Sequence, residues 1–169
     1  MKDLEEWLIV DGYNVIGAHE EWSRLPLEEA RHQLATLLSE YQATSERRVF
    51  LVFDAHRIPG AGSRHSEQQI TIYYTKEHET ADQMIERLVK QHRKSGRRIY
   101  VATSDYLEQR IVFGQGAYRL SSRELLEEFR RMKGNISSEL KGAYESKNTL
   151  GQGLGEEILK TLENWRRKK

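Results

Sequence analysis

Four aspartates stand where predicted secondary-structure elements end or begin. Three of them, Asp11, Asp54 and Asp105, each follow a short apolar run that is typical of a buried strand. The fourth, Asp82, lies in the first turn of a predicted helix. In an open, mostly parallel sheet the carboxyl ends of the strands share one edge, and ligands bind beyond that edge. We therefore expect these carboxylates to gather at one edge of the sheet.

Carboxylates gathered in this way repel one another. Two of them at about 4–5 Å repel by roughly 3–4 kcal/mol at an effective dielectric constant near ~20, so the cluster needs protons or a cation. Mg²⁺ prefers oxygen ligands and binds a few carboxylates while it keeps several waters. In such a site it would activate a water molecule and neutralise charge on a phosphoryl oxygen. The aspartates therefore indicate a divalent-metal site for phosphoryl chemistry.

Each aspartate also has a purely structural interpretation, because Asp is common as a helix cap and as a turn former. For Asp54 we favour that interpretation. For Asp11, Asp82 and Asp105 we favour the shared metal site, because three caps would otherwise have to coincide at one edge of the sheet.

Other chemistries fit the sequence less well. A phosphatase with an aspartate nucleophile needs a second carboxylate where Tyr13 stands. The two Gly-Gln-Gly segments, at 114–116 and 151–153, lack the preceding strand and the spacing of a phosphate-binding loop. The histidines show no metal-ligand spacing, and the absence of cysteine excludes disulfides, zinc–thiolate sites and thiol nucleophiles.

The elements that must position these residues alternate between strands and helices, which indicates an α/β fold with a mostly parallel central sheet. Strands are predicted over 7–10, 48–53, 69–75, 98–102 and 117–120. Helices are predicted over 26–41, from 80 to near 96, over 106–113, over 121–132 and around 158–165. The strand at 69–75 alternates like a half-exposed edge strand, and its direction stays open. The segment 55–68 has no helical period and is expected to be a long loop.

Length and charge indicate one intracellular domain. A chain of 169 residues is long enough for one sizeable core, and its net charge of +1 neither demands nor excludes nucleic acid. The amino terminus is acidic, and no stretch approaches the roughly 20 apolar residues of a membrane span. We expect a soluble cytoplasmic protein that binds no membrane. Residues 1–133 are expected to form the domain, with 134–169 as a flexible connection and a C-terminal helix with a basic tail, packed on the same domain.

Four short motifs together resemble the NYN-domain nucleases, relatives of the PIN-domain ribonucleases, and are most similar to their bacterial YacP-like branch. The motifs are Val10-Asp11-Gly12-Tyr13-Asn14, Phe53-Asp54-Ala55-His56, Glu79-Thr80-Ala81-Asp82 and Ala102-Thr103-Ser104-Asp105-Tyr106. The resemblance implies a PIN-like three-layer α/β sandwich with a C-terminal helical extension. It also implies hydrolysis of RNA phosphodiester bonds with Mg²⁺, for which Mn²⁺ can substitute. Members of this branch are similar to ribosome-associated endoribonucleases that cut mRNA in the ribosomal A site.

The resemblance assigns roles to individual residues. Asp11, Asp82 and Asp105 would form the catalytic, metal-binding set. Asn14 would hydrogen-bond a carboxylate, a metal-bound water or a phosphate.

Three further residues are candidate contacts to RNA. Arg57 and Arg64 would bind phosphates. Tyr13 would stack on a base, although an aromatic ring beside a strand more often packs against the core. The alternative to a nuclease is a non-catalytic module that binds RNA or the ribosome. The oligomeric state, the cleavage preference and the number of metal ions stay open.

Overall fold

The fold is built on a six-stranded sheet with the strand order β3-β4-β2-β1-β5-β6. The computed structural model describes residues 4–55, 64–67, 69–105, 109–110 and 114–134. Neighbouring strands are parallel except for β3 and β4, which are antiparallel. The strands are β1 (Glu5–Asp11), β2 (Arg48–Phe53), β3 (Arg64–Glu67), β4 (Ile70–Tyr74), β5 (Arg97–Ala102) and β6 (Tyr118–Leu120).

Strands β1 and β2 lie at the centre because both are apolar on both faces. Every residue from Trp7 to Val10 is buried, and so is every residue from Val49 to Phe53. Continuous apolar runs of this kind are typical of parallel strands that are covered on both sides. The predicted buried strands are confirmed here.

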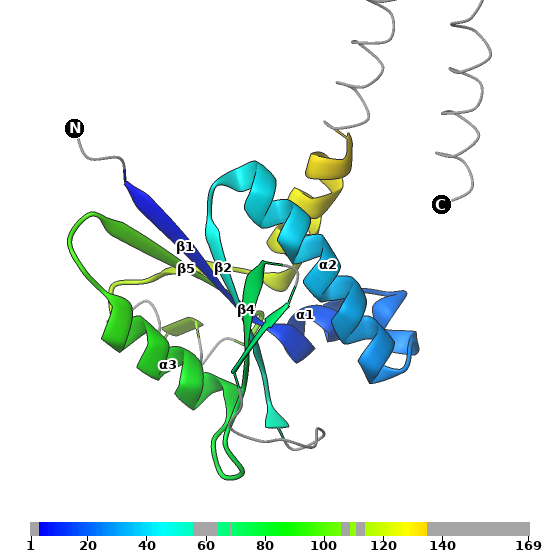
Figure 1. Cartoon of the computed structure of the whole chain (residues 1–169), viewed down its shortest axis with the longest axis horizontal. Helices are drawn as coiled ribbons and strands as arrows, with labels where there is room; N and C mark the ends of the chain where they lie inside the picture. Colours follow the sequence, from blue (N-terminus) through cyan, green and yellow to red (C-terminus); the bar gives the residue numbers. More distant parts are fainter. Residues whose placement is uncertain (1–3, 56–63, 68, 106–108, 111–113, 135–169) are drawn as a thin grey trace, which may run out of the picture. The chain divides into compact units, whose positions relative to one another are not determined.

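Helices cover both faces of the sheet, as Figure 1 shows. One face packs against α3 (Ala81–His92), which shares one apolar cluster with side chains of β1, β2 and β5. The other face carries α1 (Gly12–Ala18) and α2 (Leu27–Ser45), with the short 3-10 helix η1 (Trp22–Arg24) between them. The predicted three-layer α/β sandwich is therefore confirmed.

Two helices begin at the caps that the sequence predicts. The Thr80 hydroxyl accepts a hydrogen bond from the Gln83 amide at 3.2 Å, and the Gln83 side chain accepts one from the Thr80 amide at 3.0 Å. This reciprocal pair satisfies two amides that α3 itself leaves unbonded. The helix over 122–134 begins in a related way, because Ser121 Oγ accepts from the Glu124 amide at 3.1 Å.

The sequence-based description of the outer strands needs two corrections. Strand β4 is not the edge of the sheet, since it pairs with β2 on one side and β3 on the other. It runs parallel to β2, which settles its direction. Part of the predicted loop 55–68 forms the antiparallel edge strand β3, whose Arg64 pairs with Tyr73. The polar sequence of β3 carries no alternation, so only its pairing with β4 defines it as a strand.

The chain divides into two units, Met1–Phe129 and Arg130–Lys169, and the first contains the whole sheet. The predicted flexible connection and C-terminal helix, which together cover 134–169, fall almost entirely outside the described residues, and so does most of the predicted helix over 106–113. None of the helices in the described part of the chain is both long enough and apolar enough to cross a membrane.

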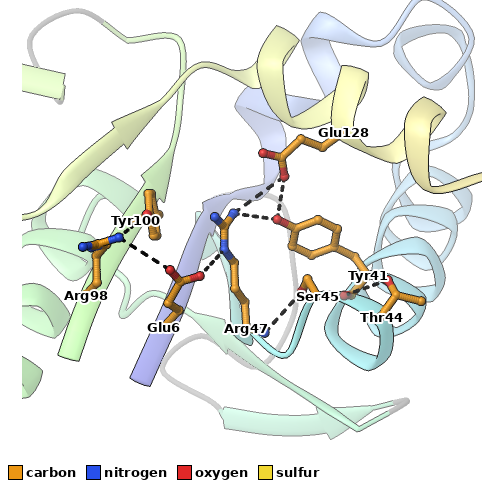
Figure 2. A network of polar contacts seen from close by, with 8 residues as sticks. All are labelled: Glu6, Tyr41, Thr44, Ser45, Arg47, Arg98, Tyr100 and Glu128. Atoms are coloured by element: carbon orange, nitrogen blue, oxygen red, sulfur yellow. Dashed lines mark hydrogen bonds and ion pairs between the residues drawn. The ribbon is translucent and has the colours of Figure 1, made fainter. Parts of the chain in front are cut away.

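A polar network centred on Arg47 joins elements near the amino ends of the strands (Figure 2). Arg47 Nε donates to Glu6 Oε2 of β1 at 2.9 Å, and its Nη1 donates to the Tyr41 hydroxyl at 2.7 Å. The Tyr41 hydroxyl in turn donates to Glu128 of the helix over 122–134. The guanidinium also lies 4.3 Å from the centre of the Tyr100 ring. Burial, together with the hydrogen bond to Glu128, raises the pKa of Tyr41 far above its ordinary value.

Candidate active site

Asp11 is a buried carboxylate at the carboxyl end of the central strand. It is the last residue of β1 and is only 8% exposed. Side chains alternate along a strand, so Asp11 faces the same side of the sheet as Trp7 and Ile9, which is the side covered by α3. Although Asp11 occupies the N-cap position of α1, its carboxylate makes no capping hydrogen bond. Helix capping therefore does not account for this aspartate.

Thr103 links Asp11 to Asp105. Its buried hydroxyl lies 3.4 Å from Asp11 Oδ2 and accepts a hydrogen bond from the Asp105 amide at 3.2 Å. Because the hydroxyl oxygen accepts from an amide, its own proton is directed toward the carboxylate. The Thr103 amide donates to the carbonyl of Leu120 at 2.9 Å, which holds this turn against β6. Thr103 thus connects the buried Asp11 carboxylate to the backbone of the exposed Asp105.

Asn14 ties three separate parts of the chain together. Its Oδ1 accepts hydrogen bonds from the Ser104 amide at 2.8 Å and from the Ser122 hydroxyl at 2.7 Å. The Ser122 amide donates to Ser104 Oγ at 3.2 Å and closes the ring of contacts. The backbone amide of Ser104 is a donor, so the Asn14 atom that faces it must be the side-chain oxygen and not the nitrogen. This contact fixes the orientation of the Asn14 side chain. Asn14 therefore positions the turn that carries Asp105.

Gly12 allows α1 to begin directly after Asp11. A Cβ atom at Gly12 would lie 2.3 Å from Cε1 of the Phe53 ring, which is buried. No residue with a side chain fits there unless the ring moves. Tyr13 follows and packs on the same ring, with centroids 5.0 Å apart, while its hydroxyl accepts from Arg31 Nη1 at 3.1 Å. Packing accounts for Tyr13 in this structure, and base stacking by its ring stays a prediction.

Asp82 lies on a different element. It is exposed in the first turn of α3, the helix that covers the sheet face toward which Asp11 points. A carboxylate in a first turn also interacts favourably with the helix dipole.

Asp54 is half-buried and lies directly after β2. The next residue, Ala55, donates its amide to the Thr75 hydroxyl at 2.8 Å. Beyond β2, a threonine hydroxyl again holds the backbone beside an aspartate.

The structure describes only one of the two arginines that are predicted to contact RNA. Arg57 lies outside the described residues. Arg64 is the first residue of β3, at the edge of the sheet, and only its backbone is described.

Thr103 and Ser122 are the residues of the candidate site that were not predicted from the sequence. The sequence signal for Thr103 is the polar run Thr103-Ser104-Asp105 directly after a strand. The signal for Ser122 is its place next to the predicted helix cap Ser121.

The donor set fits a divalent cation only in part. Within the described residues, no three His, Asp or Glu side chains are grouped closely enough to hold a metal ion. Mg²⁺ often binds through one or two carboxylates and keeps several waters. Among the predicted ligands, Asp11 and Asp105 are the two that Thr103 connects, through the Asp11 carboxylate and the Asp105 amide.

Comparison with known proteins gives a consistent result. The family model of the YacP-like NYN domain matches residues 8–167. The protein YacP of Bacillus subtilis strain 168 is 42% identical over 163 residues, which cover 95% of this chain and 96% of that protein.

Solved structures agree. The crystal structure of Rae1 (YacP) from Bacillus subtilis matches with a TM-score of 0.72 and 41% identity, over 95% of this chain and 94% of that one. A single-site variant of Rae1 matches with the same TM-score and identity, over 97% and 96% of the two chains. The motifs and the fold thus agree with the family match over nearly the whole length, and the chain belongs to the YacP-like NYN domain family.

Proposed function

We propose that this protein is a metal-dependent endoribonuclease that cuts mRNA on the translating ribosome, in the A site. Membership of the NYN family supports a nuclease-type function on RNA. The observation that carries the proposal is the carboxylate of Asp11, which is buried at a strand end, serves no helix cap, and is joined through Thr103 to Asp105. A ribosomal substrate would place the protein in the cytoplasm.

Asp11, Asp82 and Asp105 would hold Mg²⁺ or Mn²⁺. When bound, such an ion supplies an activated water and neutralises charge on the scissile phosphate. Thr103 keeps the Asp11 carboxylate oriented by donating to it, and it fixes the backbone at Asp105. Asn14 holds the 103–105 turn against α1 through the Ser104 amide. Hydrolysis of this kind leaves a 5′-phosphate and a 3′-hydroxyl and needs no attack by the RNA 2′-hydroxyl.

The decisive experiment uses an actively translated mRNA. Wild-type protein and Asp11→Asn are each added to a translation reaction, with and without EDTA, and new 5′ ends are mapped. We expect cuts at defined codons with the wild type only, and none after EDTA. Equal cutting by both proteins would remove Asp11 from the mechanism. Naked RNA is a poor test, because the ribosome would position the substrate.

A second candidate is a non-catalytic module that binds RNA or the ribosome. The observation that favours it is the lack of a group of three metal-ligating side chains among the described residues. Co-sedimentation with ribosomes, without any EDTA-sensitive cutting of translated mRNA, would support this candidate over the nuclease.

A further inference from the structure

A cavity of about 630 Å³ lies between the first turns of α2 and the carboxyl ends of β2 and β4. This volume is typical of pockets that bind small molecules. The cavity is on the α2 face of the sheet, whereas Asp11 points to the α3 face. Its lining includes Glu28, Glu29, Arg31, His32, Phe53 and Tyr74.

The sheet side of the cavity is aromatic. The rings of Phe53 and Tyr74 are stacked, with centroids 5.9 Å apart and planes at 24°. Both rings border the cavity, but Phe53 is buried, whereas Tyr74 is only half-buried. A flat ring held in this way is a surface on which a nucleobase can stack.

The α2 side of the cavity is polar and mixed in charge. Glu28 and Glu29 contribute carboxylates, and Arg31 and His32 contribute a guanidinium and an imidazole. Two carboxylates disfavour a phosphate group as the occupant. They suit a group with N–H donors, while Arg31 suits a carbonyl oxygen. Cytosine and guanine carry both an amino group and a carbonyl group on one edge, whereas uracil carries two carbonyls and adenine none.

The cavity is connected to the candidate active site through α1. Arg31, which lines the cavity, donates to the Tyr13 hydroxyl at 3.1 Å, and the Tyr13 ring packs on Phe53. Tyr13 is the neighbour of Asn14, which holds the turn that carries Asp105. The contacts of Tyr13 thus join the lining of the cavity to the residues that hold the 103–105 turn.

We propose that this cavity binds one base of the RNA substrate, a cytosine, stacked on Tyr74 with its amino group toward Glu28 or Glu29. The inference rests on the proposed function, since it supplies that nuclease with a base-selective subsite. It gives the enzyme a sequence preference that the aspartates alone do not provide.

Binding of cytidine and uridine 5′-monophosphates to the full chain tests this proposal. The measurement is saturation-transfer NMR or calorimetry in EDTA, so it depends neither on metal nor on cleavage. We expect saturable binding of the cytidine nucleotide, at least about fivefold tighter than that of the uridine nucleotide. Tyr74→Leu should weaken binding at least about fivefold, whereas Tyr74→Phe, which keeps the ring, should preserve it. Replacing Glu28 and Glu29 together by Gln should abolish the preference for cytidine.

A matched control is Tyr118→Leu, the same change at a tyrosine that is 48% exposed and outside the cavity lining. It should leave nucleotide binding unchanged. Equal binding of the two nucleotides, or no binding up to about 10 mM, overturns the subsite. An equal loss in Tyr118→Leu and Tyr74→Leu overturns it as well. Each of these outcomes leaves the nuclease proposal to its own test, because cleavage of translated mRNA by wild type and not by Asp11→Asn is scored separately.

Discussion

The hydroxyl of Thr103 lies 3.4 Å from the carboxylate of Asp11, although 92 positions separate the two residues in the sequence. The same hydroxyl accepts a hydrogen bond from the amide of Asp105 at 3.2 Å. One buried side chain thus contacts the buried carboxylate of Asp11 and fixes the backbone at Asp105.

Replacing Thr103 with valine should reduce RNA cleavage by about 10- to 100-fold, the usual effect of removing a group that orients a metal ligand. Valine has nearly the same shape but offers no hydroxyl to Asp11 or to the Asp105 amide. Thr103→Ser is the control and should retain most activity. The measurement is the initial rate of cut formation on translated mRNA, with the Mg²⁺ dependence of each variant. Full activity in Thr103→Val would show that Asp11 needs no such support.

Replacing Asp11 with asparagine should reduce cleavage by at least about 10³-fold, as expected for a group central to catalysis. The melting temperature should stay equal or rise, because the substitution removes a charge that is 8% exposed. Thermal unfolding by circular dichroism checks the second part. A strong loss of stability would instead indicate that the carboxylate is structural.

Replacing Asn14 with leucine should lower the free energy of unfolding by about 2 kcal/mol or more, because two hydrogen bonds are lost and their donors are left unpaired. Asn14→Asp is the matched control, since a carboxylate oxygen can still accept from Ser104 and Ser122. Urea denaturation measures both variants. If the two variants unfold at the same urea concentration, the acceptor at this position is not what stabilises the turn.

Replacing Gly12 with alanine should destabilise the protein by roughly 2–3 kcal/mol, because the new methyl group would overlap the buried Phe53 ring. Shrinking the ring in the double variant with Phe53→Leu should recover part of that loss. Additivity of the two single changes would contradict a direct clash. The comparison is a double-mutant cycle in urea.

The Tyr41 hydroxyl should make stability fall as the pH rises above about 10. Its pKa is raised in the folded state from an ordinary value of 10.0, so above that pH the folded protein retains a proton that the unfolded chain has lost. The contribution of Tyr41 to the free energy of unfolding is complete below pH 10 and declines as the pH approaches the higher pKa that Tyr41 has in the folded state. Tyr41→Phe should therefore show a flatter decline in urea-unfolding free energy between pH 9 and 11. An unchanged slope would mean that Tyr41 ionises normally.

The sequence predicted the parts of the fold that local pattern encodes. The apolar runs of β1 and β2, the capping box at Thr80 and the position of Asp11 at a strand end all follow from periodicity and residue type. Strand β3 could not be predicted, because Arg64–Glu67 is polar throughout and becomes a strand only by pairing with β4.

The supports of the candidate site were hidden for a related reason. The contacts that Thr103 and Ser122 make join residues about a hundred positions apart, and neither residue type is unusual in a turn or a helix start. The aspartates were recognisable because their chemistry is distinctive. The hydroxyls that orient them are not, so only the fold reveals their role.

The ring of contacts around Asn14 has a consequence for biosynthesis. It requires Ser104 and Ser122, which lie 90 and 108 positions downstream of Asn14. A nascent chain that has not yet extended past Ser122 cannot complete this ring, because the two hydrogen bonds of Ser122 are still missing. In the enzyme we propose, the 103–105 turn would therefore gain its full support only after Ser122 has left the ribosome.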